Sequence, residues 1–141
     1  MHNLSHNTKL IQVQDAIVAG TSTIGIDPID TQGYDGVMIF GSIATADAGN
    51  YAKARQGALS DLEDAADLEG TKLAPSDDGN SFLIDIFRPK DRYVDIQVVR
   101  GVSTALGPIY ALLYGGPRKA PAEQGSTINA GIHASPAEGT A

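Results

Sequence analysis

Two segments of the chain, Ser81–Phe87 and Tyr93–Val99, alternate apolar and polar side chains with a period of two. The apolar positions are Phe82, Ile84 and Ile86 in the first segment and Val94, Ile96 and Val98 in the second. This is the period of a β-strand with one buried face, whereas a helix repeats about every 3.6 residues. The charged link Arg88–Arg92 has a proline at a turn position, and it predicts that the two strands form a hairpin.

Other short apolar segments predict further strands. Lys9–Val18 alternates weakly, while Gly36–Ala44 and Ile109–Tyr114 contain continuous apolar runs, which are typical of strands covered on both faces. Thr21–Ile26 and Thr71–Ala74 are shorter candidates. Because glycine, proline, aspartate and asparagine separate these segments, we expect about seven or eight short strands. The sequence therefore predicts an all-β fold, a single-domain antiparallel β-sandwich that is jelly-roll-like.

The segment Ala44–Leu68 fits the strand pattern less well, because it is rich in alanine, leucine and glutamate, which favour helices. Gly49 and Gly57 each disfavour a single long helix by about 1 kcal/mol. We therefore expect a strand over Tyr51–Ala58, followed by one short helical turn near Asp61–Asp67.

The composition divides the 141 residues into three zones. Residues 1–8 form a polar N-terminal arm without an apolar period, and residues 9–116 form the sandwich domain. Residues 117–141 consist largely of proline, glycine, alanine, serine and threonine, so we expect an extended C-terminal tail that builds no core of its own. Ordering such ends costs about 1–2 kcal/mol of backbone entropy per residue, and we expect a partner's surface to offset that cost.

The formal net charge of −7 argues against a nucleic-acid partner, because binding phosphates usually requires a basic surface. Seven acidic residues lie from Asp61 to Asp78 against the single cation Lys72. We interpret this stretch as a solvated loop, with docking on a basic partner as the alternative. The N-terminus shows no secretory signal, and the uncharged stretch Gly101–Gly116 is too short to span a membrane, so we expect no membrane partner.

The residue types needed for catalysis or metal binding do not gather in a recognisable pattern. The chain has no cysteine, which excludes disulfides, thiolate metal sites and cysteine nucleophiles. The three histidines, His2, His6 and His133, fall in the arm or the tail, where we do not expect a rigid catalytic triad. Asp85, Asp91 and Asp95 could supply a glycosidase pair, but the alternation places Asp85 and Asp95 on the outward, solvated faces of the predicted hairpin. We therefore expect no enzyme activity, no cofactor and no bound metal.

Five stretches, taken in order, resemble the small cement (decoration) proteins of tailed bacteriophage capsids. They are Ile29–Val37 (IDTQGYDGV), Ala65–Thr71 (AADLEGT), Ile86–Val94 (IFRPKDRYV), Pro108–Gly115 (PIYALLYG) and Ser135–Ala141 (SPAEGTA). Each stretch is short, and their joint order along almost the whole chain carries the resemblance. The resemblance implies a jelly-roll-like sandwich on the capsid exterior that ties neighbouring subunits together without covalent bonds. It carries over no catalytic or ligand-binding motif.

The resemblance also implies partners and a location. We expect the chain to bind the major capsid protein and a further copy of itself, first as a homodimer and second as a trimer. It would lie on the outer capsid surface of the virion, and in the host cytoplasm during assembly. The candidate contact elements are the arm, the tail and a cluster of cations. The cations are Arg88, Lys90, Arg92, Arg118 and Lys119.

Two other functions suit a β-sandwich without catalytic residues. One is a carbohydrate-binding module on the virion surface, although aromatic residues make up only 6% of the chain and sugars are usually stacked on aromatic rings. The other is a tail or connector subunit, which would assemble by itself into rings or tubes.

Overall fold

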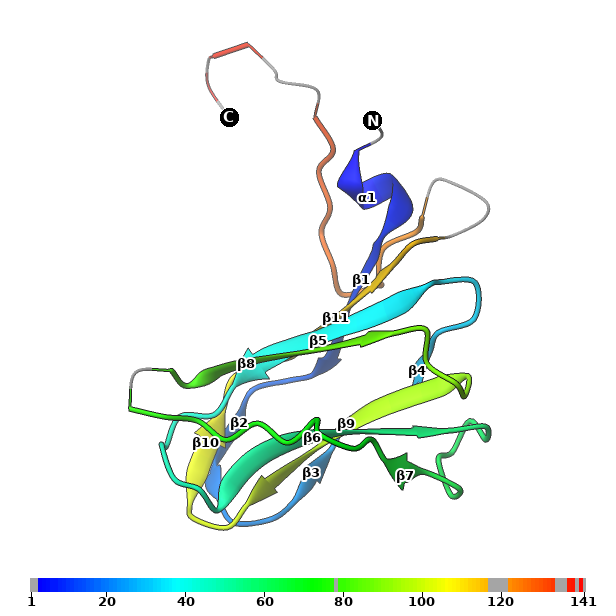
Figure 1. Cartoon of the computed structure of the whole chain (residues 1–141). Coiled ribbons are helices and arrows are strands. Elements are labelled where there is room, and N and C mark those ends of the chain that lie inside the picture. Colours follow the sequence, from blue (N-terminus) through cyan, green and yellow to red (C-terminus); the bar gives the residue numbers. More distant parts are fainter. Residues whose placement is uncertain (1–2, 78, 117–121, 134–136, 139, 141) are drawn as a thin grey trace.

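The computed structural model describes residues 3–77, 79–116, 122–133, 137–138 and 140. Two antiparallel sheets lie one above the other, and both ends of the chain extend beyond the first of them (Figure 1). The first sheet has the strand order β1-β11-β5-β8. Its strands are β1 (Lys9–Gln14), β11 (Ile109–Tyr114), β5 (Gly36–Ser42) and β8 (Ser81–Phe87). The all-β sandwich predicted from the sequence is confirmed.

The second sheet has the strand order β3-β9-β6-β7, and β4 also pairs with β9. Its strands are β3 (Ile24–Gly25), β4 (Ile29–Asp30), β9 (Tyr93–Arg100), β6 (Asn50–Gly57) and β7 (Ala66–Asp67). A separate ribbon pairs β2 (Ile17–Gly20) with β10 (Thr104–Leu106). One short helix, α1 (Leu4–Asn7), interrupts the predicted extended arm.

The hydrophobic core lies between the two sheets and is built from the alternating residues of both. Val94, Ile96 and Val98 of β9 are completely buried, and so are Val37 and Ile39 of β5. The apolar row of β8 joins the same cluster from the first sheet. The period of two therefore has the meaning that the sequence predicted, because it marks the side chains that face the core.

The hairpin predicted from Ser81–Phe87 and Tyr93–Val99 is wrong, although both strands exist. β8 pairs with β5 in the first sheet, and β9 pairs with β6 in the second. The link Arg88–Arg92 crosses from one sheet to the other, and Arg88 begins the crossing with a φ of 51°, in the left-handed region. The error has a physical cause: alternation reports which face of a strand is buried and carries no information about which strand lies beside it.

The expected strand over Tyr51–Ala58 corresponds to β6, but the helical turn near Asp61–Asp67 is wrong. Turns followed by the two-residue strand β7 occupy that segment. The Asp64 carboxylate accepts the N–H groups of Ala58 (2.8 Å) and Leu59 (3.2 Å), which holds the chain in a turn. Side-chain acceptors of this kind compete with the helical hydrogen-bond pattern.

The interpretation of Asp95 as a solvated strand residue is also wrong, because Asp95 is only 2% exposed. It lies directly across from Arg55 on β6, whose Nε donates to Asp95 Oδ1 at 3.1 Å. The guanidinium forms a second bond to the other carboxylate oxygen. This hydrogen bond and the charge of Asp95 raise the pKa of Arg55 above its ordinary value. The pair therefore serves the cohesion of the second sheet rather than a glycosidase site.

Candidate protein-contact surfaces

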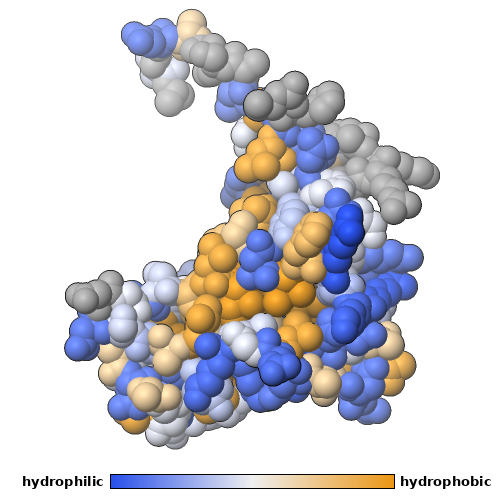
Figure 2. Space-filling model, in the orientation of Figure 1, coloured by the Kyte–Doolittle hydropathy of each residue, from blue (hydrophilic) through white to orange (hydrophobic). Residues whose placement is uncertain are grey.

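The first sheet has a largely apolar outer face, meaning the side that points away from the core. The paired rows across the strands run Leu10–Leu112–Met38–Asp85 and Gln12–Tyr110–Phe40–Leu83. Leu83 is 54% exposed and Phe87 is 60% exposed, while Met38 and Phe40 are half-buried. The rings of Phe40 and Tyr110 stack with their centroids 5.9 Å apart. In Figure 2, apolar side chains are concentrated across the middle of the molecule, over β5 and β8.

The outer face corrects the prediction that Gly36–Ala44 and Ile109–Tyr114 form strands covered on both sides. Val37, Ile39, Ala111 and Leu113 enter the core, but the intervening residues point away from it and stay half-buried. Both strands thus carry apolar side chains on both faces. The described part of this chain covers mainly the face that points into the core. A contiguous apolar patch of this kind commonly marks a protein contact.

Tyr114 crosses the outer face and joins three strands. Its hydroxyl donates a 2.6 Å hydrogen bond to Asp85 Oδ1 on β8. The ring lies over Gly36 of β5, where a Cβ would come within 2.4 Å of the tyrosine oxygen. Burial, followed by the hydrogen bond and negative charge of Asp85, raises the pKa of Tyr114 to about 12. Any side chain at position 36 would displace this tyrosine.

The Tyr114–Asp85 bond predicts a loss of stability at alkaline pH. Because the pKa of Tyr114 rises from 10.0 to about 12 on folding, its contribution is fully present below pH 10 and is lost as the pH climbs through 12. We expect a loss of about 1 kcal/mol over this window, since the group is partly solvated. Urea denaturation of the wild type and of Tyr114→Phe, compared near neutral pH and across the window, measures it. An equally steep alkaline loss in Tyr114→Phe would show that other groups cause it.

The arm and the tail form a terminal lobe, which comprises residues 3–8 and 122–133. The side chain of Gln124 holds it together, because its amide nitrogen donates to the carbonyls of Ser5 (3.1 Å) and Thr8 (2.9 Å). Its amide oxygen accepts the N–H of Leu10 at 2.7 Å. Gly125 N–H then donates to Leu10 O at 2.9 Å, so the tail is attached to the edge of β1. The described parts of both ends thus contact each other and their own domain.

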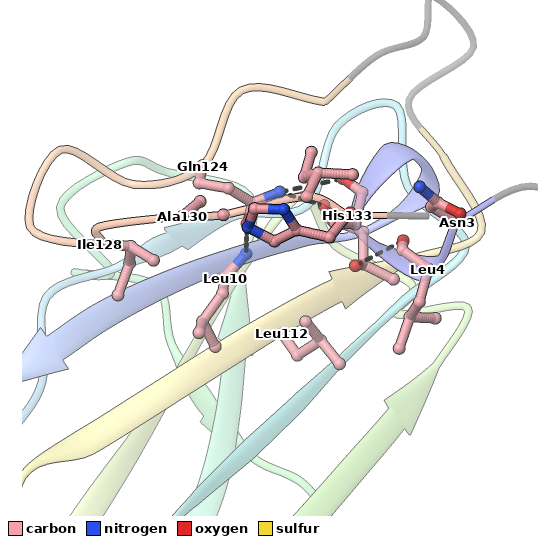
Figure 3. A pocket seen from close by; sticks show the side chains of 12 residues that line it. Asn3, Leu4, Leu10, Leu112, Gln124, Ile128, Ala130 and His133 are labelled. Atoms are coloured by element: carbon pink, nitrogen blue, oxygen red, sulfur yellow. Dashed lines mark hydrogen bonds between the residues drawn. The ribbon is translucent and has the colours of Figure 1, made fainter. Parts of the chain in front are cut away.

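A groove of about 500 Å³ opens between the terminal lobe and the outer face (Figure 3). Leu4 of the arm, Leu10 of β1 and Leu112 of β11 lie along its floor, while His133 approaches from the tail. Other residues that line it include Thr8, Gln124, Ile128, Ala130 and Ile132. Since Leu10 and Leu112 belong also to the outer face, the groove and the outer face form one continuous surface.

The structure places Arg88, Lys90 and Arg92 together in the crossing between the sheets, where they line a recess of about 430 Å³ with Tyr34. Arg92 forms a bidentate pair with Asp30, at 2.9 and 2.7 Å. This hydrogen bond lowers the pKa of Asp30 below its ordinary value. The Arg88 guanidinium lies 5.0 Å from the centre of the exposed Phe87 ring.

The predicted cation cluster is therefore divided. Arg92 is occupied within the domain, whereas Arg88 and Lys90 form no ion pair with any described residue. Arg118 and Lys119 lie outside the described residues. The outer face was not predicted from the sequence. The continuous apolar runs of Gly36–Ala44 and Ile109–Tyr114 were a signal for it, because an apolar strand that is covered on one side leaves apolar side chains on the other.

The acidic stretch from Asp61 to Asp78 is less purely solvated than we expected. Asp64 and Asp61 accept backbone N–H groups within their own turn. Asp67 pairs with Lys53 at 2.6 Å. Several of these carboxylates therefore shape the turn after β6.

The described residues contain neither a metal-binding cluster nor a membrane-spanning helix. No group of three or more histidine, cysteine, aspartate or glutamate side chains stands close enough to hold a metal ion. In the same part of the chain, no helix has the length and apolarity needed to cross a membrane.

Comparison with known proteins adds no relative: neither a protein-family model nor a curated protein sequence matches the chain significantly.

Proposed function

We propose that this chain is a non-enzymatic structural protein that binds the outside of a phage head and bridges neighbouring major capsid subunits. The observation that carries the protein-binding part is the apolar outer face, with Leu83 54% and Phe87 60% exposed beside the half-buried Phe40. Burying such a face removes about 25 cal/mol of unfavourable hydration per Å². The capsid part rests on the resemblance of five ordered stretches to cement proteins.

The shape of the contact surface suits a clamp on a protein shell. A flat sheet face covers a broad surface, while the groove under the terminal lobe offers a recess for a protruding side chain or loop. The cations Arg88 and Lys90 stand at one margin of this face, next to Phe87. An apolar centre with a charged margin is the usual anatomy of a protein interface.

The mechanical role follows from avidity. Internal pressure in a DNA-filled head pushes capsid subunits apart, and a clamp that contacts two of them must release both before they separate. Each contact can be of ordinary size, because repetition over the shell multiplies the stabilisation. The protein would therefore act on the outer capsid surface after assembly in the host cytoplasm.

The test is binding to purified empty heads that lack their cement protein. We expect saturable binding of the wild type and increased resistance of the loaded heads to heat. Phe40→Thr should weaken the affinity by about 30-fold, the effect of losing an interface residue worth about 2 kcal/mol. The matched control is Val18→Thr, because Val18 is 85% exposed on β2, away from the outer face.

Each contrary result has a clear meaning. Equal heat resistance of heads with and without the protein would remove the clamp role. Equal affinity of Phe40→Thr and Val18→Thr would show that the outer face is not the contact. Binding of glycans in place of heads would favour the carbohydrate module, and rings or tubes of the isolated chain would favour a tail or connector subunit.

A further inference from the structure

We propose that the free edge of β8 pairs with β8 of a second copy of this chain, antiparallel and about a two-fold axis at Leu83. β8 is the last strand of the first sheet, and within the described part of the chain it pairs with β5 alone. Among the described residues, no backbone hydrogen bond reaches its other side. A row of unpaired N–H and C=O groups along a strand is a template for another strand.

The bonds at the two ends of the β5–β8 ladder show which backbone groups face outward. Ile43 N–H donates to Asn80 O at 2.8 Å, and Arg88 N–H donates to Asp35 O at 2.7 Å. Both pairs continue the register of the ladder. Because bonded and non-bonded pairs alternate along antiparallel strands, the residues that bond to β5 are Phe82, Ile84 and Ile86. The backbone groups that point outward belong to Ser81, Leu83, Asp85 and Phe87.

The other edges of the two sheets are protected or short, unlike β8. β1 has a register shift between Gln12 and Gln14, and Gln124 and Gly125 occupy both outward groups of Leu10. The edge strands β3, β4 and β7 have two residues each. β8 has seven residues in unbroken register and contains no lysine, arginine or proline. Natural edge strands usually carry such devices to prevent pairing.

The side chains of β8 select one register for a symmetric pair. A two-fold axis at Leu83 sets Leu83 against Leu83, and Ser81 against Asp85 of the other copy. An axis at Asp85 would oppose two carboxylates, and an axis at Ile84 would set Leu83 against Asp85. Only the axis at Leu83 sets an apolar side chain against an apolar one and a hydroxyl against a carboxylate. It also places the outward-pointing backbone N–H and C=O groups of the two strands opposite each other.

The space beside β8 is open enough to accept a strand. The neighbouring segment Gly70–Leu73 does not pair with β8, because Leu73 exchanges two 2.8 Å hydrogen bonds with Ala52 of β6 instead. A recess of about 230 Å³ separates this segment from Leu83 and Asp85. Leu73 is 40% exposed and lines the recess, so the added strand would meet an apolar neighbour below it.

Pairing of two β8 strands would join two outer faces into one continuous eight-stranded face, since each copy contributes four strands. A rigid double face holds two contact surfaces at a fixed spacing, which is what bridging two neighbouring subunits requires. This consequence rests on the proposed function. The pairing itself does not, because it follows from β8 alone.

Cysteine crosslinking tests the register, because the chain has no cysteine of its own. Bonded antiparallel pairs have Cα atoms about 5.5 Å apart, within the range that a disulfide spans. We expect Leu83→Cys to oxidise to a covalent dimer in non-reducing gels. Val18→Cys is the control, since Val18 is 85% exposed and lies on β2. Equal crosslinking of the two variants would overturn the pairing.

A charged substitution at Leu83 tests the pairing without a crosslinking reaction. We expect the wild type to sediment as a dimer and Leu83→Lys to sediment as a monomer with an unchanged circular dichroism spectrum. The control is Leu59→Lys, because Leu59 is 50% exposed in the turn after β6. A monomeric wild type, or a dimeric Leu83→Lys, would overturn the proposal.

These measurements use the isolated chain, so they separate the two proposals. A wild type that dimerises but does not bind heads would remove the capsid role and leave the pairing intact. A wild type that binds heads as a monomer would remove the pairing and leave the capsid role intact.

Discussion

Replacing Arg100 with methionine should lower the free energy of unfolding by about 3–5 kcal/mol, because a buried guanidinium would lose four hydrogen bonds at once and the buried Thr104 carbonyl would lose this donor. Arg100 ends β9 and is 4% exposed. Its Nε donates to Ser22 O (2.7 Å), and one terminal nitrogen donates to Val18 O and Thr104 O, both at 3.0 Å. The other terminal nitrogen donates to Ser22 Oγ at 2.6 Å. One side chain thus ties the β2–β10 ribbon to the second sheet.

Urea denaturation of Arg100→Met against the wild type measures this loss. Arg100→Lys should fall between the two, because an ammonium keeps the charge but cannot reproduce the planar fork of donors. The matched control is Arg92→Met, since Arg92 pairs with Asp30 on the surface, with side chains 46% and 45% exposed. Surface pairs of this kind contribute little to stability, because solvent screens them. A loss for Arg100→Met no larger than that of the control would contradict the role assigned to Arg100.

Replacing Arg55 with methionine is the second change with a large expected effect, again about 3–5 kcal/mol. The Arg55 side chain is 24% exposed, whereas Asp95 is 2% exposed. Removing the arginine therefore leaves a buried carboxylate without its counter-charge. Asp95→Val should cost less, because the partly exposed guanidinium of Arg55 can turn toward water.

The double variant Arg55→Met/Asp95→Val tests whether the loss of stability in Arg55→Met comes from the missing charge partner or from a loss of packing. With both charges gone, no unpaired ion remains, and we expect most of the stability of the wild type to return. Denaturation curves for the wild type, the two single variants and the double variant give the coupling energy. If the losses of the single variants merely add in the double variant, the pair makes no specific contribution.

The error over the hairpin shows where sequence reasoning on this chain stops. Phe82, Ile84 and Ile86 were correctly placed on one buried face, and so were Val94, Ile96 and Val98. Proximity in sequence suggested that the two strands pair, but each pairs along its whole length with another strand: β8 aligns seven pairs with β5, and β9 aligns eight with β6. The short link between them then only has to cross the sandwich. Pairing is decided by competition among all the strands, which no local pattern contains.

The buried polar groups and the outer face were missed for related reasons. Asp95 occupies a position that looks solvated when β9 is considered alone, and only β6 supplies the Arg55 that pairs with it. Arg100 lies beyond the end of the predicted strand, and only distant segments supply the carbonyls that accept its N–H groups. Gly36–Ala44 was expected to be covered on both faces, and the structure leaves Phe40 partly open. The candidate contact surface could be identified only from the structure, which shows which side of β5 is covered.

The sequence by itself determined the main strands of this protein and which of their faces are apolar, although it missed β4, β7 and β10 and predicted a strand at Thr71–Ala74, where only Leu73 forms an isolated bridge. These properties are local, because backbone period and side-chain hydrophobicity act within a few neighbouring residues. The tertiary structure decided which strands adjoin, which ions are buried, that Gln124 joins the arm to the tail, and that no described residue pairs with the outer edge of β8. Those outcomes depend on groups far apart in the chain, and their energies exist only once the two sheets have come together.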